Sequence, residues 1–242
     1  MSSQPSIYVG QLRVDEPVTM ITDLVITVVC FYAFYSLSKQ QNELSKAQNF
    51  LRYYFLMMGF ATMIGGVFGH GFLYYFGLNW KLPGWLTSMF AVTLIERASI
   101  EQTKPIVNPK VGKIMGVANI IELVTFVSLT FVTLFFRLLD PRDSFRFVEI
   151  HTAYGLLLIV LPLQAYVYLK TRNPGSKLFL IGIGFVILTA FIYYFQLAFS
   201  PWFNQHDMSH LFIALASWLF YKGTLRLSDG YQFELNQQSS FQ

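Results

Sequence analysis

Seven apolar stretches, each near the ~20 residues needed to cross a bilayer core, dominate the sequence. They are separated by short polar loops, and no long soluble segment interrupts them. The predicted spans are 18–38, 49–76, 84–96, 114–136, 147–169, 178–200 and 206–225, and the short third span extends further if it continues through Ile100. This pattern predicts an all-α, polytopic membrane protein built as a seven-transmembrane helix bundle over residues 1–227. The polar residues 228–242 are expected to form a disordered tail.

The composition agrees with a multi-pass integral membrane protein. Hydrophobic residues make up 54% of the chain and charged residues only 12%, whereas about one quarter of a soluble domain is charged. The net charge of +4 comes from basic residues in the loops, so we expect no nucleic-acid partner. Cys30 is the single cysteine, which excludes an intrachain disulfide. The first sixteen residues are polar, and we expect no cleavable signal.

The distribution of Lys and Arg among the loops predicts the orientation of the bundle. Twelve of these residues fall on the side that follows the first, third, fifth and seventh spans, and five fall on the other side. Basic loops stay in the cytoplasm. We therefore expect an N-terminus that is outside or lumenal and a cytoplasmic C-terminus.

Ionisable residues at membrane depth are costly, so they usually face the bundle interior and mark function. With seven crossings, all four histidines fall in the outer half of the membrane: His70, His151, His206 and His210. Asp23 and Asp207 share this level. The convergence favours a buried polar site, and histidines wetted by lipid headgroups are the alternative.

The pair His206 and His210 lies four residues apart, on one face of the seventh predicted helix. Both imidazoles can reach one ion from there, and imidazole suits zinc. His70 supplies a third ligand from the second helix. Three histidines with an open fourth position form the usual catalytic zinc arrangement. The prediction is a Zn²⁺ site held by His70, His206 and His210.

Other polar residues have several interpretations. His151 has three interpretations: a fourth ligand, a general acid, or a water-exposed residue where its helix begins. Asp207 also has three interpretations: it orients a ligand imidazole, it acts as a general base, or it complements the helix dipole. Glu122 and Glu96 lie away from the histidine level, and we expect Glu122 to be hydrogen-bonded within the bundle, with Asn119 as a partner on the same face, or to relay protons.

The seventh span resembles that of the alkaline ceramidases, whose superfamily includes the progestin and adipoQ receptors. The family pattern is His-x-x-x-His followed by small residues, Leu, Ser or Thr and an aromatic. Here the matching residues are His206-Asp207-Met208-Ser209-His210 and Ala214-Leu215-Ala216-Ser217-Trp218-Leu219. The second span ends in Gly65-Gly66-Val67-Phe68-Gly69-His70, where the family has a Gly-rich stretch with a zinc-binding His. The resemblance implies the same three zinc ligands.

The sequence departs from this family at two polar positions. Gly66 stands where the family has its active-site serine, and Trp80 or Lys81 stands where it has an aspartate. Asp15 and Glu16 are all that remains of the acidic calcium-binding cluster of the animal enzymes. The resemblance therefore supports the zinc more strongly than it supports ceramide hydrolysis.

Two functions from different classes follow. The first is an intramembrane zinc-dependent hydrolase that cleaves an amide or ester in a lipid, with Asp207 or His151 moving the proton. The second is a lipid-binding receptor or scaffold in which the zinc is structural. The missing serine and aspartate favour the second, and the polar groups beside the ligands favour the first. A transporter is less well supported, because the chain lacks paired repeats. We expect the hydrolase.

Overall fold

The structure, a computed structural model, describes residues 4–41, 43–136 and 145–227. The predicted tail 228–242 lies outside the described residues, as do Arg137 and Arg142 of the loop after the fourth predicted span. The elements are, in chain order, β1 Ile7–Val9, β2 Leu12–Val14, α1 Pro17–Ser38, α2 Lys46–Ile64, the π-helix η1 Gly65–Gly71, α3 Leu73–Phe76, the 3-10 helix η2 Leu78–Lys81, α4 Leu82–Thr103, η3 Lys104–Ile106, α5 Pro109–Phe135, α6 Arg146–Ala153, the π-helix η5 Tyr154–Val160, α7 Leu161–Thr171, α8 Pro174–Tyr194 and α9 Gln205–Leu225.

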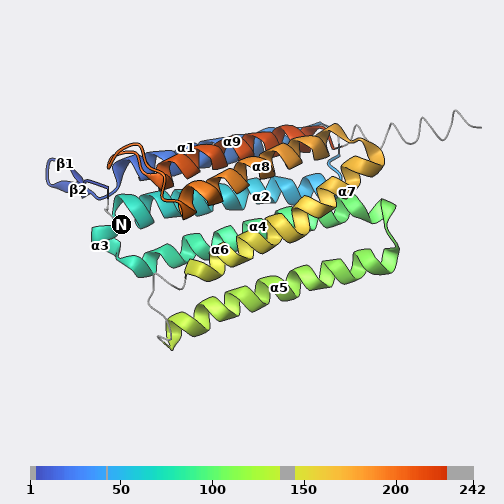
Figure 1. The fold of residues 1–242 in the computed structure, drawn as a ribbon, viewed down its shortest axis with the longest axis horizontal. Coiled ribbons are helices and arrows are strands. Elements are labelled where there is room, and N and C mark those ends of the chain that lie inside the picture. Colours follow the sequence, from blue (N-terminus) through green and yellow to red (C-terminus); the bar gives the residue numbers. More distant parts are fainter. Residues whose placement is uncertain (1–3, 42, 137–144, 228–242) are drawn as a thin grey trace, which may run out of the picture.

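The fold is a bundle of helices that run side by side along the long axis of the molecule (Figure 1). Helices α1, α2, α8 and α9 form one part, α4 and the continuous α6–η5–α7 segment follow, and α5 lies at the outer edge. The antiparallel hairpin of β1 and β2, in which Ile7 pairs with Val14, sits at one end together with α3.

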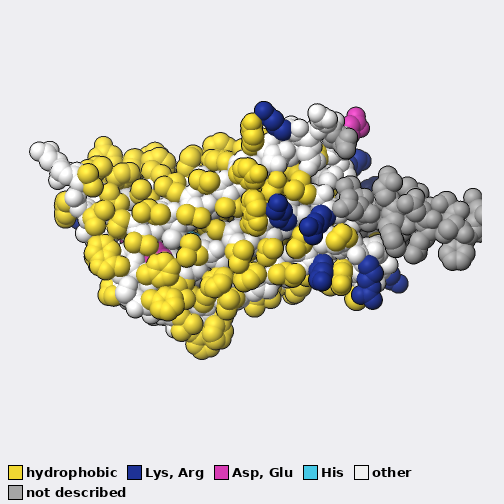
Figure 2. Space-filling model, turned by 90° about the horizontal axis from the view of Figure 1, so that it is seen from above, with side chains coloured by type: hydrophobic (Ala, Val, Ile, Leu, Met, Phe, Trp, Pro, Cys, Tyr) yellow, Lys and Arg dark blue, Asp and Glu magenta, His cyan; other side chains and the backbone are white. Residues whose placement is uncertain are grey.

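Five of these helical segments are long and apolar enough to cross a membrane, so the chain is a membrane protein by length and composition. They are Pro17–Ser38, Lys46–Gly71, Pro109–Phe135, Arg146–Thr171 and Pro174–Tyr194. Helices α4 and α9, which correspond to the third and seventh predicted spans, are as long and lie in the same bundle, but they are less apolar. Apolar side chains cover most of the face seen in Figure 2, and Lys and Arg gather toward one end of it.

Local sequence explains where the helices begin. Proline occupies the first turn of α1, α5 and α8, where its fixed φ suits a helix start. Asn108 and Asn173 precede two of these prolines and accept hydrogen bonds from backbone amides of the first turn. Ser45 and Gln48 form a capping box at the start of α2.

Four predicted spans differ from the observed helices by five residues or more at one end, and the fourth is one of them because α5 begins at Pro109 rather than at residue 114. The third is longer than 84–96, because α4 continues to Thr103 and buries the charged Glu96 inside the bundle. The second does not run unbroken to residue 76, since η1 ends at Gly71 and α3 is a separate turn. The sixth ends at Tyr194 rather than at residue 200.

Hydrogen bonds between side chains and neighbouring helices fix the bundle, as expected where lipid supplies little hydrophobic driving force. Ser36 of α1 bonds Tyr221 of α9 at 2.7 Å, and Gln48 of α2 donates to the Thr224 carbonyl of α9 at 3.0 Å. The free thiol of Cys30 is buried in the core between these helices. Helix α5 is the least buried of the five apolar segments, since only 17% of the residues in its most apolar stretch are buried inside the protein.

Candidate functional site

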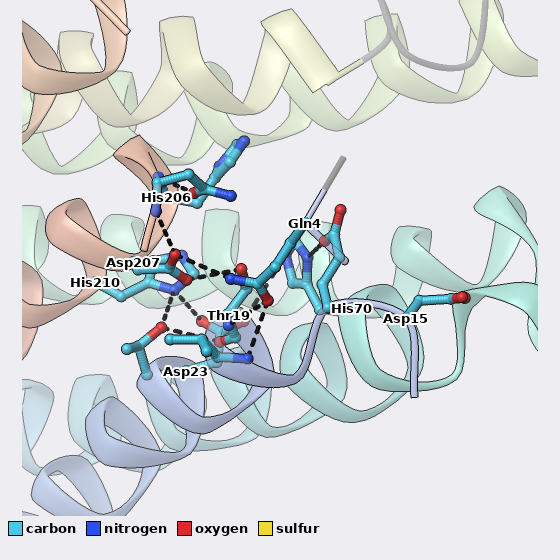
Figure 3. A network of polar contacts seen from close by, with 12 residues as sticks. Gln4, Asp15, Thr19, Asp23, His70, His206, Asp207 and His210 are labelled. Carbon is cyan, nitrogen blue, oxygen red and sulfur yellow. Dashed lines mark hydrogen bonds and ion pairs between the residues drawn. The ribbon is translucent and has the colours of Figure 1, made fainter. Parts of the chain in front are cut away.

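A capping box at the start of α9 sets the position of His206 and His210. The Asn204 amide donates to Asp207 Oδ2 at 2.7 Å, and Asn204 Oδ1 accepts from the His206 amide at 2.8 Å. These bonds satisfy amides that have no partner within the helix. The helix therefore begins just before the two histidines, which lie one turn apart (Figure 3). His210 faces Thr22 of α1 and His70 of η1, whereas the His206 ring lies beside His70 and beside Tyr193 of α8.

The glycines of η1 let it approach α1 closely and bring His70 to the same place. A methyl group on Gly66 would stand 2.8 Å from Asp23 Cβ, and one on Gly71 would overlap Met20 Sδ. A larger residue at position 66 would therefore push against α1, whereas at position 71 the flexible Met20 side chain would have to move. The π-helical turn that carries His70 is a form that is frequent at functional sites.

The structure brings together the three predicted ligands His70, His206 and His210. The ring centroid of His70 lies 6.3 Å from that of His206 and 6.1 Å from that of His210. Asp23 lies between two of these rings, with its oxygens 3.9 Å from His70 Nε2 and 3.5 Å from His210 Nδ1. The site thus joins three imidazoles and one carboxylate from α1, η1 and α9.

Hydrogen bonds at Nδ1 determine which ring nitrogen of each histidine is available. His70 Nδ1 bonds the carboxylate of Glu16, which only accepts, so Nδ1 carries the proton. His210 Nδ1 lies 3.1 Å from Thr22 Oγ1, and the hydroxyl proton of Thr22 already goes to the Thr19 carbonyl at 3.0 Å. His210 Nδ1 is therefore also the donor. Both neutral rings keep their lone pair on Nε2, the arrangement that partner groups impose on metal-binding histidines.

Two charged groups outside the helical spans face this site. Burial raises the pKa of Glu16, but its hydrogen bond to His70 and the positive charges nearby, including Lys81, outweigh burial and hold the pKa below its usual value. Burial lowers the pKa of Lys81, although Glu16 and Asp23 oppose that effect. The Lys81 stem packs against Gly69, where an added Cβ would stand 3.3 Å from Lys81 Cγ. Glu16 is thus ionised beside His70, with a cation close by.

Asp207 does not accompany the imidazoles as the sequence suggested. Its side chain is 0% exposed, and its oxygens accept from the Asn204 amide, from Thr19 Oγ1 at 2.8 Å and from Gln4 Nε2 at 3.2 Å. Gln4 also accepts from the Val18 amide at 3.0 Å. Asp207 therefore ties the start of α9 to α1 and the N-terminal segment. The helix-start interpretation agrees with these contacts, and Asp23 is the carboxylate beside the histidines.

His151 lies in a different group of side chains. It is 0% exposed, and its Nδ1 contacts Glu122 Oε1 at 2.7 Å while its Nε2 contacts the Met89 carbonyl at 2.9 Å. The prediction of a wetted residue at a helix start is wrong, because the ring is enclosed and stacks on Phe126. The contacts of His151 are with α4 and α5, which separates it from the three-histidine site.

Glu122 is hydrogen-bonded within the bundle as predicted, to His151, but its expected partner Asn119 was wrong. Asn119 donates to Glu96 Oε2 at 2.6 Å, so Glu96 and not Glu122 is its partner. Within the part of the chain that the structure describes, one group brings three ligand atoms within 4.8 Å of one another: Glu96, Glu122 and His151. The three histidines of the other site are spaced more widely, and a shared ion there requires the rings to close.

Sequence reasoning missed the roles of Glu16, Thr22 and Gln4. Glu16 comes directly before the proline that opens α1, at the same membrane level as the histidines. That position was a usable signal for Glu16. Nothing local in the sequence indicates that Gln4 reaches Trp202 and Asp207, about two hundred residues away.

Comparison with known proteins identifies the family. Residues 18–229 match a family of unknown function (DUF6962), and the chain belongs to it. No curated protein and no solved structure matches the chain.

Proposed function

We propose that this chain is an intramembrane zinc-dependent hydrolase acting on a lipid amide or ester, similar to the alkaline ceramidases. The proposal includes seven crossings, with α4 and α9 added to the five most apolar segments because they lie in the same bundle and have similar lengths. The N-terminus is outside or lumenal and the C-terminus cytoplasmic. The uneven distribution of basic residues supports this orientation.

His70, His206 and His210 are the residues that would hold the zinc. The observation in favour is chemical: two of the imidazoles donate from Nδ1 to oxygen partners and keep Nε2 free. Zinc bound there would polarise the carbonyl of an amide or ester and make water more acidic. Glu16 and Thr22 hold the two rings in this orientation.

Asp23 is the group that would accept the proton during hydrolysis. Its carboxylate lies 3.5 Å and 3.9 Å from ring nitrogens of His210 and His70, and this is the observation that carries the proposal. A general base must lie within reach of the proton that it takes. Asp23 replaces Asp207 in this role, since the oxygens of Asp207 are occupied by α1, the capping box and Gln4.

The same carboxylate supports one alternative. The Asp23 oxygen that lies 3.9 Å from His70 Nε2 is near the separation of about 3.3–3.6 Å expected for two ligand atoms on one four-coordinate zinc. Asp23 would then be a fourth ligand that closes the metal shell. Gly66, which carries no hydroxyl where the resembling enzymes have a serine, agrees with that reading. The protein would be a lipid-binding receptor or scaffold with a structural zinc.

Substitution of Asp23 separates the two. We would purify the wild type, Asp23→Asn and the control Asp15→Asn, whose carboxylate pairs instead with Arg13 and the Tyr74 amide. Each is assayed for zinc and for hydrolysis of a panel of lipid amides and esters. A hydrolase with Asp23 as base loses about 10²–10⁴-fold in turnover in Asp23→Asn while zinc stays bound.

Other outcomes of this experiment count against the hydrolase. Loss of zinc from Asp23→Asn, with an inactive wild type that itself holds zinc, supports the receptor or scaffold. A wild type without zinc after growth and purification with the metal contradicts both.

A further inference from the structure

A second group of buried polar side chains lies between α4, α5 and α6, and the proposed hydrolase does not use it. Its members are Glu96 of α4, Glu122 of α5 and His151 of α6, whose ligand atoms all lie within 4.8 Å of one another. Glu96 and His151 are 0% exposed, and the Glu122 side chain is 9% exposed. Two carboxyl groups and an imidazole are therefore packed together inside an apolar bundle.

The imidazole of His151 is held in one orientation. Its Nε2 lies 2.9 Å from the carbonyl oxygen of Met89, which can only accept, so Nε2 carries a proton. Nδ1 therefore points at Glu122, 2.7 Å away, with one proton between the two atoms. A backbone carbonyl that fixes one ring nitrogen as a donor and leaves the other for a cation is a common feature of metal sites.

Two carboxylate oxygens in the group have no hydrogen-bond partner. Glu96 Oε2 accepts from Asn119 at 2.6 Å and Glu122 Oε1 contacts His151, but the buried Glu96 Oε1 and Glu122 Oε2 are unsatisfied. Leaving such atoms unpaired in an apolar interior costs free energy. Without a metal, a proton shared between the Glu96 and Glu122 carboxyl groups joins them, whereas one cation among the three side chains binds both of these oxygens at once.

The backbone leaves room for Glu96 at a π-helical turn. A methyl group at Gly155 of η5 would overlap Glu96 Oε1, so the carboxylate occupies the space that any larger residue would need. The absence of a side chain at Gly155 lets Glu96 Oε1 lie against α6–η5, the segment that carries His151.

We propose that Glu96, Glu122 and His151 form a second metal site that binds one first-row divalent cation such as Zn²⁺ or Mn²⁺. The cation takes the place of the proton between His151 Nδ1 and Glu122 and of the proton that the two carboxyl groups share, and both protons are released. With a neutral imidazole, two carboxylates and a dication make a group with no net charge, which is the state that an apolar interior favours. Mixed nitrogen and carboxylate ligands suit ions of this class. The site ties α5, which is otherwise little buried, to α4 and α6.

The test isolates this site from the histidine site. In a His206→Ala/His210→Ala background, Glu96→Gln and Glu122→Gln are compared with Glu101→Gln, a control on α4 whose carboxylate pairs with Lys104. Each protein is incubated with Zn²⁺ or Mn²⁺ alone, desalted and analysed for metal. We expect about one ion per chain in the background and in the control, and a loss of at least tenfold in Glu96→Gln and Glu122→Gln.

Equal metal in Glu96→Gln, Glu122→Gln and Glu101→Gln overturns the proposal, as does a background protein without bound metal. If the background does not fold, the same three single variants are made in the otherwise natural chain, where a difference of one ion per chain between control and test variants is expected. The two sites fail separately. If the protein binds one ion, and this ion is unaffected by histidine substitution but lost in Glu96→Gln, the zinc of the proposed function is contradicted and the second metal site is supported.

Discussion

Asp23 packs directly on Gly66: a Cβ at residue 66 would stand 2.8 Å from Asp23 Cβ and 3.6 Å from its Oδ2. A side chain at residue 66 would thus meet the Asp23 side chain of α1. Among the described residues, Asp23 is the carboxylate that lies between the rings of His70 and His210, and Gly66 leaves room for it.

Gly66→Ala therefore tests the packing of η1 on α1. The added methyl overpacks the contact with Asp23, and we expect a loss of about 1–3 kcal/mol in stability. Gly184→Ala of α8 is the matched control, because nothing lies within 4 Å of its added Cβ. Thermal unfolding in detergent measures both variants. Equal melting temperatures for the two would show that position 66 is not closely packed.

Gln4→Ala tests the tie between the N-terminal segment and the start of α9. Its side chain donates to the Trp202 carbonyl at 2.6 Å and to Asp207 Oδ2 at 3.2 Å, and the substitution leaves both partly unsatisfied. We expect a cost of about 1–3 kcal/mol, measured as a lower melting temperature. Gln11→Ala, at an exposed position in the hairpin turn, should change nothing. A melting temperature of Gln4→Ala equal to that of Gln11→Ala contradicts the tie.

Lys81→Met tests the electrostatics at the mouth of the histidine site. Removing a cation beside Glu16 and Asp23 should raise the affinity for Zn²⁺ several-fold in chelator-buffered titrations. Burial lowers the pKa of Lys81, so the wild-type side chain loses its charge at a lower pH than a free lysine does. The difference in affinity between variant and wild type should therefore shrink as the pH rises toward that lowered pKa. A difference that stays constant or grows with pH argues against an effect of the lysine charge.

The sequence predicted helix ends well where a local start signal is present and less well elsewhere. Residues 18–38 and 206–225 agree with α1 and α9 within one residue at each end, since proline and a capping box mark their starts. The end of α4 was placed too early, because Glu96 and the residues after it read as the beginning of a polar loop. A hydropathy pattern cannot show that Asn119 forms a hydrogen bond with Glu96 inside the bundle.

The polar residues illustrate a second limit. Topology fixes how deep a residue lies, so His70, His206 and His210 were assigned to one level and do lie together. It does not fix the position around the bundle, and His151 faces Glu122 instead. A signal for Asp23 was present: Thr19, Thr22 and Asp23 repeat at helical spacing and form a polar face on an apolar helix. Contacts such as Gln4 with Asp207 depend on the tertiary fold, which local patterns do not encode.

The zinc content of His210→Ala compared with the wild type tests the central proposal most directly. Both proteins are expressed with zinc, purified in the same detergent and analysed for metal and protein, so any ion at the second site contributes equally. The account predicts one zinc per chain less in His210→Ala, with the chain still folded. Equal zinc in the two proteins would contradict the assignment of His70, His206 and His210 as ligands.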